Sequence, residues 1–146
     1  MNRTLFRLTS LDPAHDRAAF SSDSGELNRY LRDYAMQDIR RRVAACFVAM
    51  SDDQRIAGYY TLSSTSLLLA DLPAKTAKKL PRYPTLPAVR LGRLAVDRAF
   101  ARQGLGGALL ADALSRAARS EIAAYALLTE AKDDTAASFY RHHGFT

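Results

Sequence analysis

Residues 89–110, VRLGRLAVDRAFARQGLGGALL, decide the fold of this chain. An apolar stretch at 89–97 runs into a glycine-containing turn, and the apolar residues after Gly104 recur at helical spacing. A strand that ends in such a turn and opens a helix leaves several backbone N–H groups without partners at the helix N-terminus. Glycine at 104 and 106 lets the main chain come close to phosphate oxygens and adopt positive φ. The pattern therefore predicts a pyrophosphate-binding site, because bare N–H groups and the helix dipole bind phosphate. An ordinary packed strand–turn–helix junction is the alternative.

A second pattern lies near the C-terminus, in residues 131–145, AKDDTAASFYRHHGF. Asp133 or Asp134 is placed to cap a short helix, and Gly144 is placed to end it. Residues 136, 137 and 140 share one face at helical spacing. The sequence predicts a last helix that presents Tyr140 on this face.

The glycine turn resembles the acetyl-CoA loop of the GNAT superfamily of N-acetyltransferases, whose pattern is Gln/Arg-x-x-Gly-x-Gly/Ala. Aligned on Gly104 and Gly106, the chain carries Ala101 where the family has Gln or Arg. Arg98 or Arg102 is placed to supply the missing charge, and backbone N–H groups do most of the phosphate binding. The segment 131–145 is similar to the "A..FY...GF" ending of the same superfamily.

The resemblance implies acetyl-CoA as the cofactor. It implies that the main chain at 94–96, the loop at 102–107 and parts of the last helix bind it. The residues assigned to the cofactor are Leu94, Ala95, Val96, Arg102, Gln103, Gly104, Leu105, Gly106, Gly107, Asp133 and Phe139.

Tyr140 is assigned as the catalytic residue, because the family tyrosine at this position lies beside the cofactor sulfur and protonates the departing thiolate. A tyrosine hydroxyl of pKa about 10 is protonated at neutral pH and can donate to a thiolate whose conjugate acid titrates near 8.5. The alternative is a half-buried helix aromatic whose hydroxyl reaches the surface. For His142 and His143 we expect a role at the helix C-terminus rather than in a metal site.

Length and composition predict one domain, residues 1–146, of the α/β (α+β) class. The 146 residues are 48% hydrophobic, which is enough to bury a core without disulfides or metal. The single cysteine, Cys46, lies in the apolar run 44–50 and is interpreted as core filler in a reducing cytoplasm. No apolar run approaches the roughly 18 residues that span a bilayer, so we expect a cytoplasmic protein without a membrane segment.

The expected order is strand, helix, two strands, a basic connection, strand, helix, strand and helix, around one mixed, mostly antiparallel sheet flanked by helices. Leu27, Leu31 and Tyr34 should share the buried face of the first long helix. The segment from about 68 to 88 shows no readable geometry. In the superfamily a further strand follows the last helix, and we expect it to be missing here. The expected strands are 6–8, 44–50, 55–63, 88–96 and 125–129, with a hairpin turn at 51–54; the expected helices are 22–42 and 104–119.

Positive charge is concentrated beside the predicted cofactor loop. The segment 75–102 holds eight basic residues and one acid, a balance of +7 in a chain whose total is +6. Such a strip binds polyanions with fast encounter and strong salt dependence. A second cluster, Arg40–Arg42, is explained equally well by the helix dipole or by RNA contact.

Five blocks of sequence together resemble the acetyltransferase toxins of type II toxin–antitoxin modules. That family acetylates the α-amino group of aminoacyl-tRNA and blocks translation, and its antitoxins are small ribbon-helix-helix proteins. The resemblance implies a homodimer, and it implies tRNA contacts at Lys75, Lys78, Lys79, Arg82, Arg90 and Arg93. The blocks are 26–31 (ELNRYL), 57–63 (AGYYTLS), 80–84 (LPRYP), 91–97 (LGRLAVD) and 139–145 (FYRHHGF).

The expected strands offer no evident Glu or His as a general base, apart from Glu130 at a strand end. A lysine of pKa near 10.4 needs roughly 4–5 kcal/mol to lose its proton at pH 7, whereas an α-amine of pKa about 7.7–8.0 needs about 1 kcal/mol. A site without a base therefore suits aminoacyl-tRNA. The alternatives are acetylation of a small amine or a protein amine, and a non-catalytic domain that binds CoA or nucleic acid.

Overall fold

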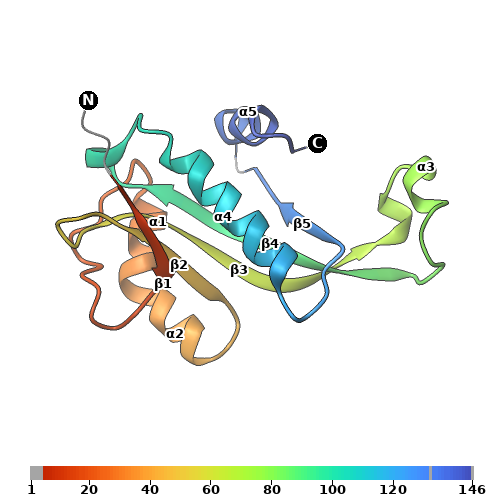
Figure 1. Ribbon diagram of the computed structural model, residues 1–146, viewed down its shortest axis with the longest axis horizontal. Coiled ribbons are helices and arrows are strands. Elements are labelled where there is room, and N and C mark those ends of the chain that lie inside the picture. Colours follow the sequence, from red (N-terminus) through yellow and green to blue (C-terminus); the bar gives the residue numbers. More distant parts are fainter. Residues whose placement is uncertain (1–4, 132, 146) are drawn as a thin grey trace.

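A five-stranded sheet forms the middle of the computed structural model, which describes residues 5–131 and 133–145 (Figure 1). Neighbouring strands follow in sequence order from β1 to β5. Among the first four, each strand is antiparallel to its neighbour, and β5 runs parallel to β4. This confirms the expected mixed, mostly antiparallel sheet. The strands are β1 Arg7–Ser10, β2 Ala45–Met50, β3 Ile56–Leu68, β4 Thr85–Val96 and β5 Ala126–Thr129.

Helices cover both faces of this sheet (Figure 1). One face carries a long helical segment made of α1, a π-helical turn and α2, and the other carries α4 with α5 beside it. Among the described helices, none has the length and apolarity needed to cross a bilayer. The helices are α1 Gly25–Arg29, the π-helical turn Tyr30–Tyr34, α2 Ala35–Arg40, α3 Ala74–Ala77, α4 Leu105–Arg119 and α5 Asp134–His142, with 3-10 turns at Leu69–Asp71 and Arg98–Phe100.

Two hydrophobic clusters lie on opposite faces of the sheet because neighbouring strand residues alternate in direction. On β3, Tyr59 packs with Leu31 of the first helical segment, whereas Tyr60 packs with Leu105 and Leu109 of α4. Gly58 permits close contact with α4, since a Cβ there would lie 3.0 Å from both the Ala95 carbonyl oxygen and Leu109 Cδ1. This contact fixes the height of α4 above the sheet.

The π-helical turn changes one expectation about the first helical segment. Leu31 is fully buried and Leu27 packs on the core, but Tyr34 is 50% exposed. In a continuous α-helix, residues i, i+4 and i+7 share one face. A π turn holds more residues per turn, so it rotates the following side chains and carries Tyr34 off the buried face. The prediction of one buried stripe was wrong at this position.

Strands β3 and β4 are longer than the sequence predicted and form a two-stranded arm. They pair out to Leu68 and Thr85, whereas β2 pairs with β3 only as far as Leu62 and β5 pairs with β4 only from Ala88 on, so the two strands stand alone at 66–68 and 85–87. The arm leaves the body of the sheet and carries α3 at its tip (Figure 1, right). Its serines and threonines lack a buried apolar pattern, and the ladder between the two strands satisfies their backbone groups. Hence the expected strands 55–63 and 88–96 were too short.

Cys46 provides a simple test of the core. Its side chain is 3% exposed, and burial raises the pKa of the thiol to about 12, although the positive charge of Arg93 opposes the shift. Because the thiolate is the reactive form, we expect modification by a thiol reagent at pH 8 to be at least about 100-fold slower in the native protein than in guanidinium. Equal rates in the two states would contradict this packing.

Candidate active site

Strand β4 leaves its parallel neighbour halfway along its length. The pairing with β5 covers residues 88–91 of β4, and Thr129 Oγ1 donates to the Leu91 carbonyl at 3.1 Å where it ends. Beyond this point, 92–96 keeps a ladder with β3 alone among the described strands. The segment 94–96, which sequence analysis assigned to the cofactor, therefore lies at an open side of the sheet. Leu94 and Val96 are half-buried, and Ala95 is buried.

A buried carboxylate ends β4 and directs the chain toward α4. Asp97 is 3% exposed; its Oδ2 accepts from the Ser21 N–H and its Oδ1 from the Ala99 N–H, both at 2.8 Å. Arg98 donates its backbone N–H to the Ser21 carbonyl and pairs its side chain with Asp23 at 2.9 Å. Ala101 stands where the family has Gln or Arg, and Arg98 or Arg102 was expected to supply the positive charge instead. Arg98 is engaged with a carboxylate, whereas Arg102 is exposed and pairs with no described carboxylate.

The turn before α4 holds two left-handed residues. Arg102 has φ 64° and Gly104, the N-cap of α4, has φ 76°. No side chain caps this helix, and no N–H group from Arg102 to Gly107 donates a hydrogen bond to a described residue. The first turn of α4 carries no acidic residue. The bare amides and the helix dipole therefore fit the diphosphate of a coenzyme.

Helix α5 packs closely on this first turn of α4. A Cβ on Gly106 would lie 3.1 Å from two carbons of the Phe139 ring, and one on Gly107 would lie 2.7 Å from Nε2 of His143. These two glycines thus have a packing role besides their predicted role in binding the cofactor. Asp133 is the N-cap of α5 and accepts from the Ala136 N–H at 2.8 Å.

Tyr140 is half-buried on α5 and lies among aromatic rings. Its ring meets those of Phe139 and Phe145 edge-on, with centroids 5.4 Å apart in both cases. Its hydroxyl makes no hydrogen bond to any described residue. The neighbouring His143 is the C-cap of α5, and its Nδ1 lies 3.0 Å from the Phe139 carbonyl oxygen, in line with the helix-end role expected for it. A phenol without a described partner, carried by a helix that packs on the first turn of α4, is suited to donate a proton to a bound ligand.

The basic residues predicted to bind tRNA fall into two groups. Those in the connection between β3 and β4 lie on or near α3, at the tip of the arm (Figure 1). Arg90 and Arg93 lie on β4 itself, shortly before the open segment 94–96. Each residue of a strand adds about 3.3 Å to this separation. Glu130, the weak candidate for a base, has a side chain that is 88% exposed and lies 4.0 Å from Arg90. The tip group is Lys75, Lys78, Lys79 and Arg82.

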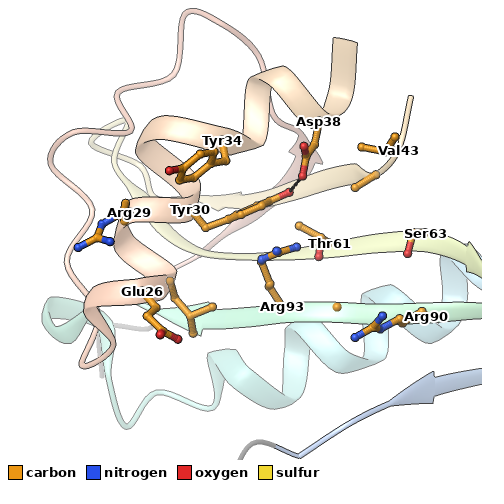
Figure 2. Close-up of a pocket in the computed structure, with 13 residues that line it drawn as sticks. Glu26, Arg29, Tyr30, Tyr34, Asp38, Val43, Thr61, Ser63, Arg90 and Arg93 are labelled. Atoms are coloured by element: carbon orange, nitrogen blue, oxygen red, sulfur yellow. Dashed lines mark hydrogen bonds between the residues drawn. The ribbon is translucent and has the colours of Figure 1, made fainter. Parts of the chain in front are cut away.

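A cavity of about 510 Å³ opens on the face of the sheet opposite α4 (Figure 2). Arg93 projects into its middle, with the guanidinium carbon 3.6 Å from the centroid of the Tyr30 ring. The Tyr30 hydroxyl donates to Asp38 Oδ2 at 2.7 Å. Sequence analysis did not single out Tyr30 or Asp38, because the π turn between them was not evident in the apolar pattern. The cavity is also lined by Glu26, Leu27, Arg29, Tyr34, Val43, Ala44, Thr61, Ser63, Arg90 and Gly92.

Comparison with known proteins agrees with this geometry. The model of the acetyltransferase (GNAT) domain family matches residues 42–146. The tRNA-acetylating toxin of Mycobacterium tuberculosis (strain ATCC 25618 / H37Rv) is 37% identical over 137 residues, which are 92% of this chain and 81% of that protein.

Two solved structures share the whole architecture. AtaT complexed with acetyl-methionyl-tRNAfMet superposes with a TM-score of 0.87 at 30% identity, covering 97% of this chain and 86% of AtaT. A mutant AtaT toxin bound to the C-terminus of the antitoxin AtaR and acetyl-CoA superposes with a TM-score of 0.77 at 26% identity, covering 96% and 83%. Because the family model matches most of this chain, the chain belongs to the GNAT family of acetyltransferases.

Proposed function

We propose that this protein is a toxin that transfers the acetyl group of acetyl-CoA to the α-amino group of aminoacyl-tRNA and so blocks translation. The observation that carries the proposal is the 37% identity, over 92% of the chain, to a relative named for tRNA acetylation. The same fold in AtaT holds an acetylated aminoacyl-tRNA. The basic residues of the arm and of β4 supply the charge that a tRNA backbone requires.

The coenzyme lies along the open side of β4. The N–H groups from Arg102 to Gly107 bind its diphosphate, and the main chain of Leu94, Ala95 and Val96 holds the arm that leads to the thioester. Arg102 and Gln103, both exposed on the loop, contact the phosphates from outside. Phe139 covers Gly106, and Asp133 keeps α5 in place as its N-cap.

The chemistry needs one proton donor and an acceptor amine that is neutral near pH 7. The amine lone pair attacks the thioester carbonyl, the C–S bond breaks, and Tyr140 gives its proton to the departing sulfur. The acylated nitrogen then loses one proton to water, and the Tyr140 phenolate takes one back from water, so the protons balance. An α-amine needs no strong base to lose its own proton, which agrees with a site where Glu130 is almost fully exposed. A small-amine acetyltransferase would instead require an acidic pocket, and the charge of segment 75–102 disfavours it.

Two partners follow from the same proposal. The first partner is the tRNA, which contacts Lys75, Lys78, Lys79, Arg82, Arg90 and Arg93. The second is an antitoxin of the ribbon-helix-helix class. AtaT is seen with the C-terminus of its antitoxin. Homodimer formation stays a prediction, tested by light scattering. The cytoplasm, where acetyl-CoA meets charged tRNA, is the proposed place of action.

Acceptor choice tests the proposal directly. Labelled acetyl-CoA is incubated with the protein and total tRNA, either charged with amino acids or uncharged. We expect label on charged tRNA alone, because the acceptor is the esterified α-amine. Transfer to polyamines or protein lysines would favour the small-amine or protein-amine alternative, and an intact protein that transfers no acetyl group would favour a binding module.

Replacing Tyr140 by phenylalanine tests the proton donor. The ring contacts with Phe139 and Phe145 remain in Y140F, so we expect an unchanged melting temperature and unchanged affinity for acetyl-CoA. The turnover number should fall about 10²–10⁴-fold, the usual contribution of a positioned acid. Full turnover in Y140F would remove this hydroxyl from the mechanism.

The left-handed turn offers a test of the proposed diphosphate site at the N–H groups from Arg102 to Gly107. Gly104→Ala adds a Cβ that meets no atom within 4 Å but forces φ 76° on a non-glycine residue, at a cost of about 1–2 kcal/mol. We expect a lower melting temperature and weaker binding of acetyl-CoA in calorimetry. Gly25→Ala is the matched control, because its Cβ is also unobstructed and its φ is not positive; it should leave the affinity unchanged and should not lower the melting temperature.

A further inference from the structure

One acidic side chain is buried at the end of β4. Asp97 is 3% exposed, and no other charged residue is buried in the part of the chain that the structure describes. Moving a carboxylate out of water costs free energy unless hydrogen bonds and opposite charges compensate. The nearest cation is the half-exposed Arg55, whose Nη2 lies 3.8 Å from Asp97 Oδ1. The burial of Asp97 therefore depends mainly on the hydrogen bonds to its two oxygens.

The two oxygens of Asp97 join segments that lie far apart in the sequence. Oδ1 accepts from the Ala99 N–H at 2.8 Å and so caps the 3-10 turn Arg98–Phe100. Oδ2 accepts from the Ser21 N–H at 2.8 Å, across 76 residues of sequence. The next residue completes the connection, because the Arg98 N–H donates to the Ser21 carbonyl oxygen at 2.9 Å. Two consecutive residues at the end of β4 thus hold both backbone groups of Ser21.

The segment around Ser21 is itself firmly held. Phe20 is buried and packs edge-on against Tyr59 of β3, with ring centroids 5.5 Å apart. Ser22 is buried too, and its N–H and its hydroxyl both donate to Oδ1 of Asn28 in α1, at 2.8 and 2.7 Å. None of these contacts uses the carboxylate, so the segment 20–22 keeps its place on the core without it.

The loop that leads to α4 has few anchors of its own. Phe100 before it and Leu105 after it are buried in the same hydrophobic cluster. Between them, two residues are left-handed, and the N–H groups from Arg102 to Gly107 donate to no described residue. The position of the loop therefore depends on its two ends, the 3-10 turn and α4. Asp97 fixes the first of these ends.

We propose that Asp97 is a positioning residue for acetyl-CoA: by tying the start of the loop to the segment 20–22, it sets where the N–H groups from Arg102 to Gly107 meet the diphosphate. The proposal rests on the diphosphate site proposed above and adds the residue that holds this site in place. Asp97 is buried with both oxygens engaged, so it acts through the backbone of 98–101 and not by touching the coenzyme. Tyr140 lies on α5, to which Asp97 makes no described hydrogen bond, so the effect falls on coenzyme binding and not on proton transfer.

Replacing Asp97 by asparagine tests this role with little change in size. Asparagine offers one oxygen to two N–H groups, so either Ser21 or Ala99 loses its acceptor and faces an NH₂ group instead. The affinity for acetyl-CoA falls with the fraction of molecules whose loop is in place. We expect the dissociation constant in calorimetry and the KM for acetyl-CoA to rise about 10–100-fold, the range for a hydrogen bond to a charged group. At saturating acetyl-CoA, kcat should stay within about threefold.

Two control variants leave the connection intact. Asp12 accepts from the Ala14 N–H at 2.8 Å, the same contact two residues ahead, but it is exposed and its carboxylate holds no distant described segment. Asp12→Asn should therefore leave the affinity for acetyl-CoA unchanged. Ser21→Ala should do the same, because Asp97 and Arg98 bind only the backbone of Ser21.

A second variant approaches the connection from its other side. Asn28→Ala removes the contacts of Ser22 with α1 and leaves Asp97 in place. Because the support of the loop is loosened, we expect the dissociation constant of acetyl-CoA to rise about threefold.

The split between KM and kcat separates positioning from loss of fold. A purely structural role would lower the melting temperature and the amount of active protein, and hence kcat, without raising the KM for acetyl-CoA well below the melting temperature. That pattern, or an unchanged affinity in Asp97→Asn, would overturn the proposal. If Asp97→Asn does not fold, an unchanged affinity in Asn28→Ala would overturn it. Unchanged affinity in Gly104→Ala would instead count against the diphosphate site itself. Failure to acetylate charged tRNA would count against the proposed acceptor alone, because the calorimetry uses no acceptor.

Discussion

The left-handed turn at Arg102–Gly104 is the constraint on which the site depends. It starts α4 without a side-chain cap, so the first N–H groups of the helix stay free for a ligand. Two contacts keep this helix end in place. Gly58 seats α4 on the sheet, and Gly106 and Gly107 let α5 approach from the other side. Loss of either contact would move the amides relative to Tyr140, which α5 carries.

Strand β4 brings the two halves of the reaction together. Its last residues run free of β5 on the side assigned to the coenzyme, and its bulge at Gly92 turns Arg93 to the opposite face. One strand thus separates the uncapped start of α4, the proposed diphosphate site, from a cavity that contains Arg93 without a described carboxylate partner. The acetyl donor and a polyanionic acceptor can therefore approach the same few residues without competing for one surface.

Sequence alone predicted the parts of the molecule whose physics is local. The glycine turn, a cap at Asp133 or Asp134 and the buried strand around Cys46 follow from φ preferences, side-chain capping and apolar runs, and the structure has all three, with Asp133 as the cap. The arm of β3 and β4 was missed because cross-strand pairing, rather than an apolar pattern, holds its polar residues. The exposure of Tyr34 and the direction of the Arg93 side chain could not be predicted, because no residue in the sequence marks the π turn or the β-bulge that causes them. The roles assigned to the site residues remain predictions.

A crystal structure of the protein with acetyl-CoA tests the central claim most directly. The account predicts the coenzyme diphosphate on the N–H groups from Arg102 to Gly107, with the thioester sulfur within hydrogen-bond reach of the Tyr140 hydroxyl. A diphosphate bound away from the start of α4, or a Tyr140 hydroxyl directed away from the sulfur, would contradict it.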